Sequence, residues 1–135
     1  MATYTANYGL HQWEASDNFL RTDFNTDFGI IDGALGEKAE FVTGAYAGDG
    51  AAARTVSLGF TPKAVLVMRE DGTASYTNNS TSVYGGLAAE GTPVKKSGQN
   101  AVAVITGGFQ VAHQGYPTDI YTNSSGQNYH YLALR

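Results

Sequence analysis

The spacing of apolar positions changes twice along the chain. Residues 1–15 carry isolated Tyr, Leu and Trp side chains among small polar ones, with the period of neither a strand nor a helix. From Ser16 to Leu35 the spacing is helical, and after Glu40 short runs rich in Val, Tyr and Thr are separated by Gly, Asn and Ser clusters. The pattern predicts a mainly β protein with a short N-terminal arm and helix, divided into residues 1–39 and 40–135.

A single apolar stripe follows the predicted helix. Its four large residues are Phe24, Phe28, Ile31 and Leu35. Residues at these spacings share one helical face, and Thr22 or Asp23 is expected to cap the start while Gly36 ends the helix. A helix this short with two internal glycines is marginal alone, so the stripe needs a partner surface. Two partners stay open: the chain's own β domain, or two further copies packed around an axis, which we favour.

The first 15 residues are expected to form an extended arm. Their large apolar side chains are Tyr4, Tyr8, Leu10 and Trp13. A segment too short to fold alone that carries such side chains is expected to dock, either on the rest of a trimer or on a neighbouring protein. The alternative is a disordered tail with incidental aromatic residues.

Residues 40–135 are expected to form an antiparallel β-sandwich or compact barrel. Runs 41–46 and 53–58 are interpreted as a hairpin. Residues 64–68 are apolar at consecutive positions, which predicts a central strand covered on both faces. Further strands are expected at 83–89, 101–106, 109–113 and 129–134.

Two glycine pairs carry a structural prediction within this domain. Gly107-Gly108 separates two predicted strands and indicates a tight hairpin. Gly85-Gly86 falls inside a strand run, where it indicates a bulge or a close approach of another backbone.

Composition narrows the range of partners. The net charge is −4 with an estimated pI of 5.1 in the 135-residue chain, so nucleic acid is not an expected partner. The absence of cysteine excludes disulfides, so packing or oligomerisation must stabilise the domain. No apolar leader or membrane-spanning run is evident, and we expect a protein made in a cytoplasm without membrane insertion.

Two stretches resemble known proteins. Residues 7–35 resemble the N-terminal signature of many phage and prophage tail proteins, in which Tyr-x-Leu, Trp-x-x-x-Asp, Asp-Phe-Asn and Ile-Asp-x-Ala-Leu recur. The matching segments are Tyr8 to Leu10, Trp13 to Asp17, Asp23 to Asn25 and Ile31 to Leu35. A second stretch is similar to the Gly-Phe-x-Pro-Lys-x-Val-x-Val segment of β domains in tail-fibre proteins, through Gly59, Phe60, Pro62, Lys63, Val65 and Val67.

Other features of such tail proteins also occur here: a Gly-Gly-Phe-x-Val strand at Gly107 to Val111 and an aromatic-rich last strand at Tyr129 to Leu134. The resemblance implies a virion or tail-like structural protein, commonly a homotrimer, made in a bacterial host cytoplasm. Residues 1–20 would then contact other tail or baseplate proteins. The long shaft usual in tail fibres is missing, which favours a compact tip, baseplate or decoration role.

Residues that could support catalysis are few. The chain has three histidines, and it contains no GxSxG, HExxH, P-loop or CxxC motif. Asp49, between two glycines, is interpreted as a turn residue because a calcium loop needs several oxygen ligands. We therefore expect no enzyme, no cofactor and no metal. A tail-borne glycan hydrolase remains an alternative, since the spacing of a catalytic carboxylate pair is spatial.

Two polar segments, 71–82 and 114–128, are expected to be long loops whose Tyr, Asn, Ser and Thr residues suit recognition. The candidate receptor-contact or ligand-contact residues are Tyr76, Asn78, Asn79, His113, Tyr116, Asp119, Tyr121 and Asn123. Tyrosines could stack on a sugar ring while amides and carboxylates bind hydroxyls. Two interpretations stay open: a host-surface glycan, or ordinary polar loops of a structural domain. A stand-alone lectin-like carbohydrate-binding module is the alternative to the tail protein.

Overall fold

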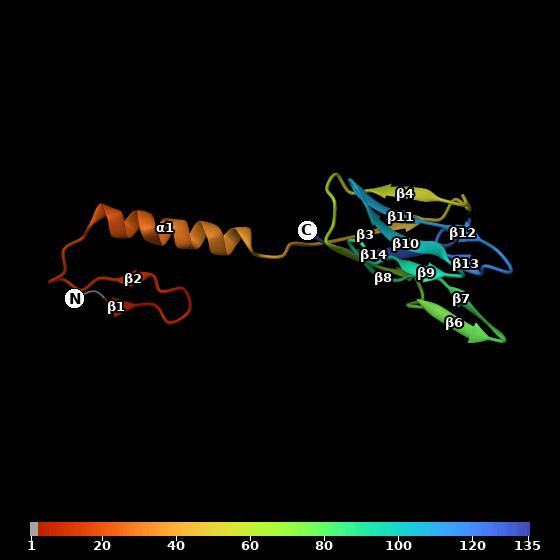
Figure 1. Cartoon of the computed structure of the whole chain (residues 1–135), viewed down its shortest axis with the longest axis horizontal. Helices are drawn as coiled ribbons and strands as arrows, with labels where there is room; N and C mark the ends of the chain where they lie inside the picture. The colour runs from red at the N-terminus through yellow and green to blue at the C-terminus, as the bar shows by residue number, and fades with distance from the viewer. Residues whose placement is uncertain (1–2) are drawn as a thin grey trace. The chain divides into compact units, whose positions relative to one another are not determined.

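The computed structural model describes residues 3–135. The chain forms two compact units, Met1–Ala39 and Glu40–Arg135. Figure 1 labels their elements along the chain. No helix in the described part of the chain is both long and apolar enough to span a bilayer.

The N-terminal unit combines a small hairpin with one helix. Strands β1 (Thr3–Tyr4) and β2 (His11–Gln12) pair antiparallel. Thr5 closes the hairpin, because its N–H donates to the Leu10 carbonyl at 2.8 Å and its hydroxyl accepts the Leu10 N–H at 2.9 Å. Gly9 supplies a positive φ of 65° in the turn. The prediction of an extended arm is therefore wrong, because local hydrogen bonds fold the segment back on itself.

Helix α1 (Arg21–Gly36) ends at Gly36, as the sequence predicted. It begins one residue before Thr22, and Leu20 precedes it in extended conformation without a side-chain cap. The predicted cap at Thr22 or Asp23 is wrong. Asp23 lies instead in the first turn, where a carboxylate interacts favourably with the helix dipole.

The C-terminal unit is a β-sandwich, which confirms the predicted fold class. One sheet has the order β3-β14-β5-β8 and the other the order β4-β11-β10-β9. The strands of the first sheet are β3 (Phe41–Ala47), β5 (Ala64–Arg69), β8 (Gly86–Ala89) and β14 (Asn128–Leu134). Those of the second are β4 (Arg54–Ser57), β9 (Val94–Lys96), β10 (Gln99–Ile105) and β11 (Gly108–Val111).

A third, smaller sheet lies beside the sandwich with the order β12-β13-β7-β6. Its strands are β6 (Ser75–Asn78), β7 (Ser80–Val83), β12 (His113–Gln114) and β13 (Ile120–Tyr121). The predicted long loops 71–82 and 114–128 thus contain short strands. Because the side chains of these strands are polar and mostly exposed, the strands lack the alternation of apolar and polar residues by which a strand is predicted.

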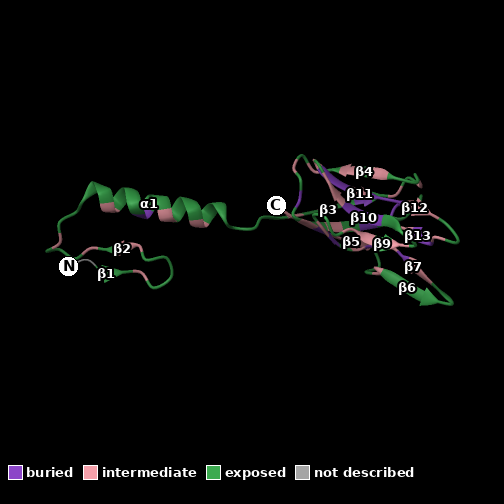
Figure 2. Ribbon diagram, viewed as in Figure 1, coloured by how far each residue is buried: buried purple, intermediate pink, exposed green. Residues whose placement is uncertain are grey.

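The core lies between the two larger sheets, and Figure 2 shows buried segments on both. Tyr46 and Tyr129 stack at 5.0 Å between ring centroids, and Phe109 approaches Tyr46 edge-on at 6.1 Å. A second cluster around Val83 and Ile120 joins the small sheet to β10. Burial of these apolar side chains is the main term stabilising the domain.

Two strand predictions need correction. Strands β3 and β4 do not form a hairpin: β3 pairs with β14, and β4 pairs with β11 in the opposite sheet. The run 83–89 is split between β7 and β8, which belong to different sheets. Pairing partners far along the chain decided both outcomes, because strand neighbours are chosen by core packing as well as by loop length.

Both glycine predictions are confirmed. Gly107 turns the β10–β11 hairpin with a φ of 81°. A Cβ at Gly85 would lie 2.0 Å from the Val67 carbonyl oxygen, so only glycine permits this close approach of two backbones.

Strand β5 is central, between β14 and β8, but only one of its faces is fully covered. Val65 and Val67 are completely buried, whereas Leu66 and Met68 are half-buried on the other face. The prediction of a strand covered on both faces is therefore wrong for the single chain.

Candidate functional site

The small sheet gathers most of the residues predicted to contact a ligand. Asp119 directly precedes β13 and is buried, with a positive φ of 58°. Its carboxylate accepts the Ser80 hydroxyl at 2.7 Å and the Tyr121 hydroxyl at 3.2 Å. Both carboxylate oxygens thus have partners within the protein, so Asp119 orders this region and is not free to bind a ligand as predicted.

Aromatic rings form a continuous, half-exposed row beside Asp119. His113 and Tyr121 are 5.5 Å apart between centroids, and Tyr121 stacks on Tyr84 at 5.7 Å. The guanidinium of Arg69 lies over the Tyr84 ring at 4.5 Å. We call Arg69, Tyr84, Tyr121 and His113 the ring row. Burial, together with the hydrogen bond to Asp119, raises the pKa of the Tyr121 hydroxyl.

A polar hollow adjoins the Arg69 end of the ring row. It has a volume of about 360 Å³ and is lined by Arg69, Glu70, Asp71, Gln127 and Asn128. The Arg69 guanidinium and the Thr73 N–H hold the pKa of Asp71 well below its usual range. Asn128 donates to Glu70 at 3.0 Å. The hollow therefore offers both charges and amide groups to a polar ligand.

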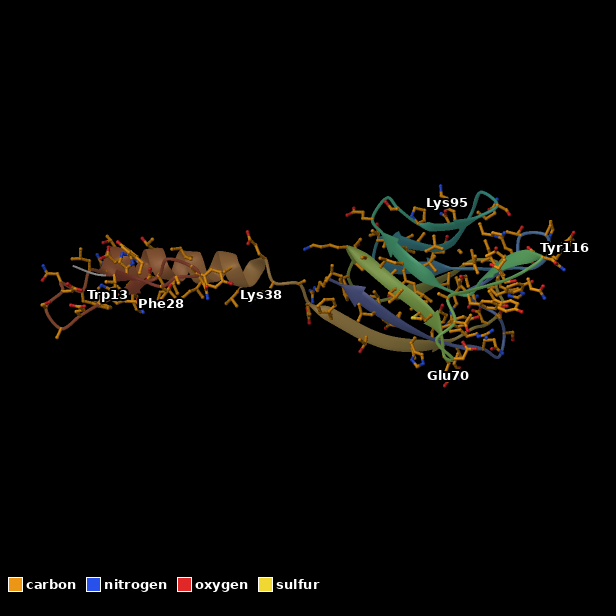
Figure 3. All side chains as sticks on the ribbon, turned by 90° about the horizontal axis from the view of Figure 1, so that it is seen from below. Trp13, Phe28, Lys38, Glu70, Lys95 and Tyr116 are labelled. Carbon is orange, nitrogen blue, oxygen red and sulfur yellow. The ribbon has the colours of Figure 1, made fainter. Side chains whose placement is uncertain are left out.

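Four predicted contact residues are exposed. Tyr76 on β6 and Tyr116 in the loop between β12 and β13 show 59% and 87% of their surface to solvent. Asn78 ends β6, and Asn79 connects it to β7 with a φ of 60°. Figure 3 shows Tyr116 at the tip of its loop, well outside the packed part of the domain.

Asn123 is not available to a ligand, contrary to the prediction. It is completely buried, and its amide donates to the Asp49 carboxylate at 2.6 Å and to the Ala51 carbonyl at 3.1 Å. Asp49 in turn accepts the Ala51 N–H at 2.9 Å. These bonds tie the β3–β4 loop to the segment after β13, and they lower the pKa of Asp49.

The apolar stripe of α1 is exposed in the single chain. The exposed fractions are 39% for Phe24, 55% for Phe28, 38% for Ile31 and 64% for Leu35. Figure 2 shows the helix as mainly exposed. Its buried residue is Asp27. Side chains of this size are seldom left uncovered together on one face of a helix.

The hairpin is anchored to α1 through Asp27. The His11 N–H donates to both Asp27 carboxylate oxygens at 3.0 and 3.2 Å, and His11 Nδ1 lies 2.8 Å from Oδ1. Six rings continue this contact, each touching the next: Tyr4, His11, Trp13, Phe19, Phe24 and Phe28. Part of the predicted self-association stripe is thus shared with the hairpin.

Sequence reasoning missed Arg69 and Tyr84 as members of the ring row, and it missed the pairing of His11 with Asp27. Arg69 directly follows the predicted strand 64–68 and Tyr84 falls within the predicted run 83–89, and neither carries a local signal of their contact. His11 and Asp27 are sixteen positions apart. An aromatic residue next to a glycine pair, as in Tyr84-Gly85-Gly86, is the one signal that could have drawn attention to the row.

The described residues contain no group of three or more His, Cys, Asp or Glu side chains arranged to hold a metal ion. No protein-family model matches the sequence, and comparisons with curated proteins and with solved structures found no similar protein.

Proposed function

We propose that this chain is a structural component of a phage-tail-like particle that assembles as a homotrimer through the stripe of α1. Its N-terminal unit attaches to neighbouring tail or baseplate proteins, and its β-sandwich caps the particle or contacts a host surface. The observation that carries this proposal is the exposure of Phe24, Phe28, Ile31 and Leu35 on one helical face.

The energetics favour a covered stripe. Burying a Phe, Ile or Leu side chain fully contributes about 1.5–3 kcal/mol relative to leaving it exposed. Two internal glycines, Gly29 and Gly33, cost about 1 kcal/mol each relative to alanine. The four side chains still expose 38–64% of their surface, so association gains part of that amount at each of them, and the sum over all four exceeds the cost of the two glycines. Three copies around an axis bury all stripes equivalently.

Attachment through residues 1–20 is supported by further exposed apolar groups in the same unit. Tyr4, Tyr8, Phe19 and Leu20 each expose half or more of their surface. Because they lie on the hairpin and the connection to α1, they remain available to a neighbouring protein after the stripe is covered.

Light-scattering mass measurement tests the proposal. The wild-type chain is expected to have three times the monomer mass, and Phe28→Asp combined with Ile31→Asp is expected to give monomers. The matched control is Asn25→Asp with Thr26→Asp, which adds the same charge to exposed positions off the stripe. A monomeric wild type, or a double stripe variant that stays trimeric, would reject the proposal.

Carbohydrate binding is a second candidate function, which the ring row favours. A half-exposed series of rings beside polar groups offers aromatic surface to the apolar C–H groups of a sugar and hydrogen-bonding groups to its hydroxyls. Exposed Tyr76 and Tyr116 lie near the same sheet and can extend such a surface.

A glycan array separates this candidate from a purely structural role. Tyr76→Ala and Tyr116→Ala should each weaken glycan binding while the melting temperature changes little, since both side chains are exposed. The control is Tyr8→Ala, an exposed tyrosine in the other unit. Carbohydrate binding would be rejected if the wild-type protein bound no glycan, or if the variants bound as the wild type does. Only the structural role would then remain.

A further inference from the structure

The outward side of the sheet β3-β14-β5-β8 is mainly apolar across all four strands. Register places Thr43, Leu132, Leu66 and Leu87 in one row across the four strands, and Phe41, Leu134, Ala64 and Ala89 in the next. A third row joins Ala45, His130 and Met68. We call these eleven residues the outer face.

The outer face is exposed and hollowed in the single chain. Phe41 and Leu87 each show 66% of their surface and Leu132 shows 38%. A hollow of about 460 Å³ lies over its centre, between Leu66, Met68 and Leu132. Strand β5 thus has apolar residues on both of its faces, as is typical of a strand buried on both sides. Within the single chain only its inward face is fully covered.

The chemistry of the outer face restricts what can cover it. Among its described residues there is no Asp, Glu, Lys or Arg, and His130 is its one titratable group. A charged or strongly polar partner would lose hydration without gaining a counter-charge. An identical face from another copy is apolar and brings no like-charge repulsion, even though each chain carries a net charge of −4.

The area of the outer face is too small for a free dimer. Four strands about 4.8 Å apart and about five residues tall span roughly 19 by 17 Å, or about 320 Å² on each copy. Stable independent complexes bury about 1,200–2,000 Å² in total. The copies must therefore be held together by another contact before these faces can associate.

Association through α1 would supply that contact. Only residues 37–40 separate the end of α1 from the start of β3, a connection that spans at most about 14 Å. Copies joined at their helices would hold their sandwiches at an effective concentration in the millimolar range. At such a concentration a small apolar face can associate.

We propose that in the trimer the three outer faces converge on the three-fold axis and form a second apolar core, centred on Leu66, Leu87 and Leu132. This inference rests on the proposed function, since it requires the helical association. The occupant of each outer face is the same face of the other two copies.

Cysteine crosslinking in the full chain tests the proposal directly, because the native sequence contains no cysteine. Leu132→Cys places one thiol at the middle of the face, and the control Lys95→Cys places one on β9 of the opposite sheet (Figure 3). At dilute concentration, oxidation is expected to give covalent dimers for Leu132→Cys and several-fold fewer for Lys95→Cys.

A thermal measurement complements the crosslinking. Leu87→Asp on the edge strand β8 is expected to lower the melting temperature by at least about 4 °C, because its aspartate would be buried in the trimer. Thr55→Asp, exposed on the edge strand β4, is the control and should change it little.

The outcomes separate the two proposals. A trimer in which Leu132→Cys crosslinks no better than Lys95→Cys, or in which Leu87→Asp melts as wild type does, overturns the converging faces and leaves the helical trimer standing. A monomeric wild-type chain overturns both.

Discussion

At the scale of single residues, Thr122 joins two elements of the β domain through one buried hydroxyl. The hydroxyl donates to the Ala101 carbonyl at 2.6 Å, lies 3.0 Å from the Ala112 carbonyl and accepts the Ala112 N–H at 2.9 Å. All three partners lie in buried backbone near the second cluster. A side chain of the same shape without a hydroxyl would remove the bond that the Ala112 N–H donates and the bond that the Ala101 carbonyl accepts.

Thr122→Val is therefore expected to destabilise the β domain by about 1–3 kcal/mol for each buried group left unpaired. Chemical denaturation, followed by circular dichroism in the far ultraviolet, measures the change in unfolding free energy. Thr55→Val, the same substitution at an exposed position on β4, should stay within about 0.5 kcal/mol of wild type. Equal effects at both positions would contradict the importance assigned to this hydroxyl.

Tyr46 makes stability sensitive to alkaline pH. Burial, and next the neighbouring Tyr129, raise the pKa of its hydroxyl well above the ordinary 10.0, while its O–H donates to the Thr122 carbonyl at 2.6 Å. The folded state keeps this proton at a pH where the unfolded chain releases it. The stability linked to Tyr46 is thus fully present below pH 10.0 and is lost as the pH rises above it.

Melting temperatures measured across the alkaline range test this linkage. The wild-type value should fall as the pH rises above 10.0, and Tyr46→Phe should show a shallower fall from a lower starting value, because the titrating group is gone. Parallel curves for the two proteins would assign the alkaline sensitivity to other groups, of which Tyr121 also has a raised pKa.

At the scale of elements, the hairpin β1–β2 depends on α1. Two strands of two residues each cannot be stable alone, so the Asp27 carboxylate, which accepts the His11 N–H, and the ring contacts must hold them. Trp13 and Phe28, labelled in Figure 3, belong to that series of rings. We therefore expect the hairpin to have low local stability.

Asp27→Asn should release the hairpin from the helix. Hydrogen bonds to a charged group contribute about 1.5–3 kcal/mol, so amide hydrogen exchange in residues 3–12 should become about tenfold faster or more. Asp32→Asn, which removes the same charge at an exposed helical position, is the control. Unchanged exchange in the Asp27 variant would show that the aromatic contacts alone anchor the hairpin.

At the scale of the whole molecule, the chain consists of two units joined by the exposed residues 37–40, which belong to no helix or strand. Lys38, labelled in Figure 3, lies within this connection. The basic residues of the β domain lie largely in or next to paired strands. Backbone held in a paired strand cannot enter the active site of a protease.

Limited trypsin digestion should therefore cut first after Lys38 and leave a resistant fragment that begins at Ala39. Mass spectrometry identifies the fragment, and Lys38→Gln should slow its appearance strongly. An initial cut within the β domain would mean that the domain opens more easily than its packing indicates.

The spacing of hydrophobic residues was sufficient to predict the fold class. The positions of glycines were sufficient to predict the end of α1 at Gly36 and the two features at Gly85 and Gly107. Each depends on local physics: side-chain period, the conformational freedom of glycine, and turn geometry. Tyr76 and Tyr116, which the sequence predicted to be within reach of a ligand, are exposed, although Tyr76 lies on strand β6 and not in a loop.

Only the tertiary structure decided which strands pair and which polar residues are accessible. Asn123 and Asp119 have the composition of a recognition loop, yet both are buried by hydrogen bonds to residues distant in sequence. Strand β4 pairs with β11 and not with β3, and the outward face of β5 is not fully covered within the chain. These outcomes depend on contacts between residues far apart along the chain, and no local pattern of side chains encodes such contacts.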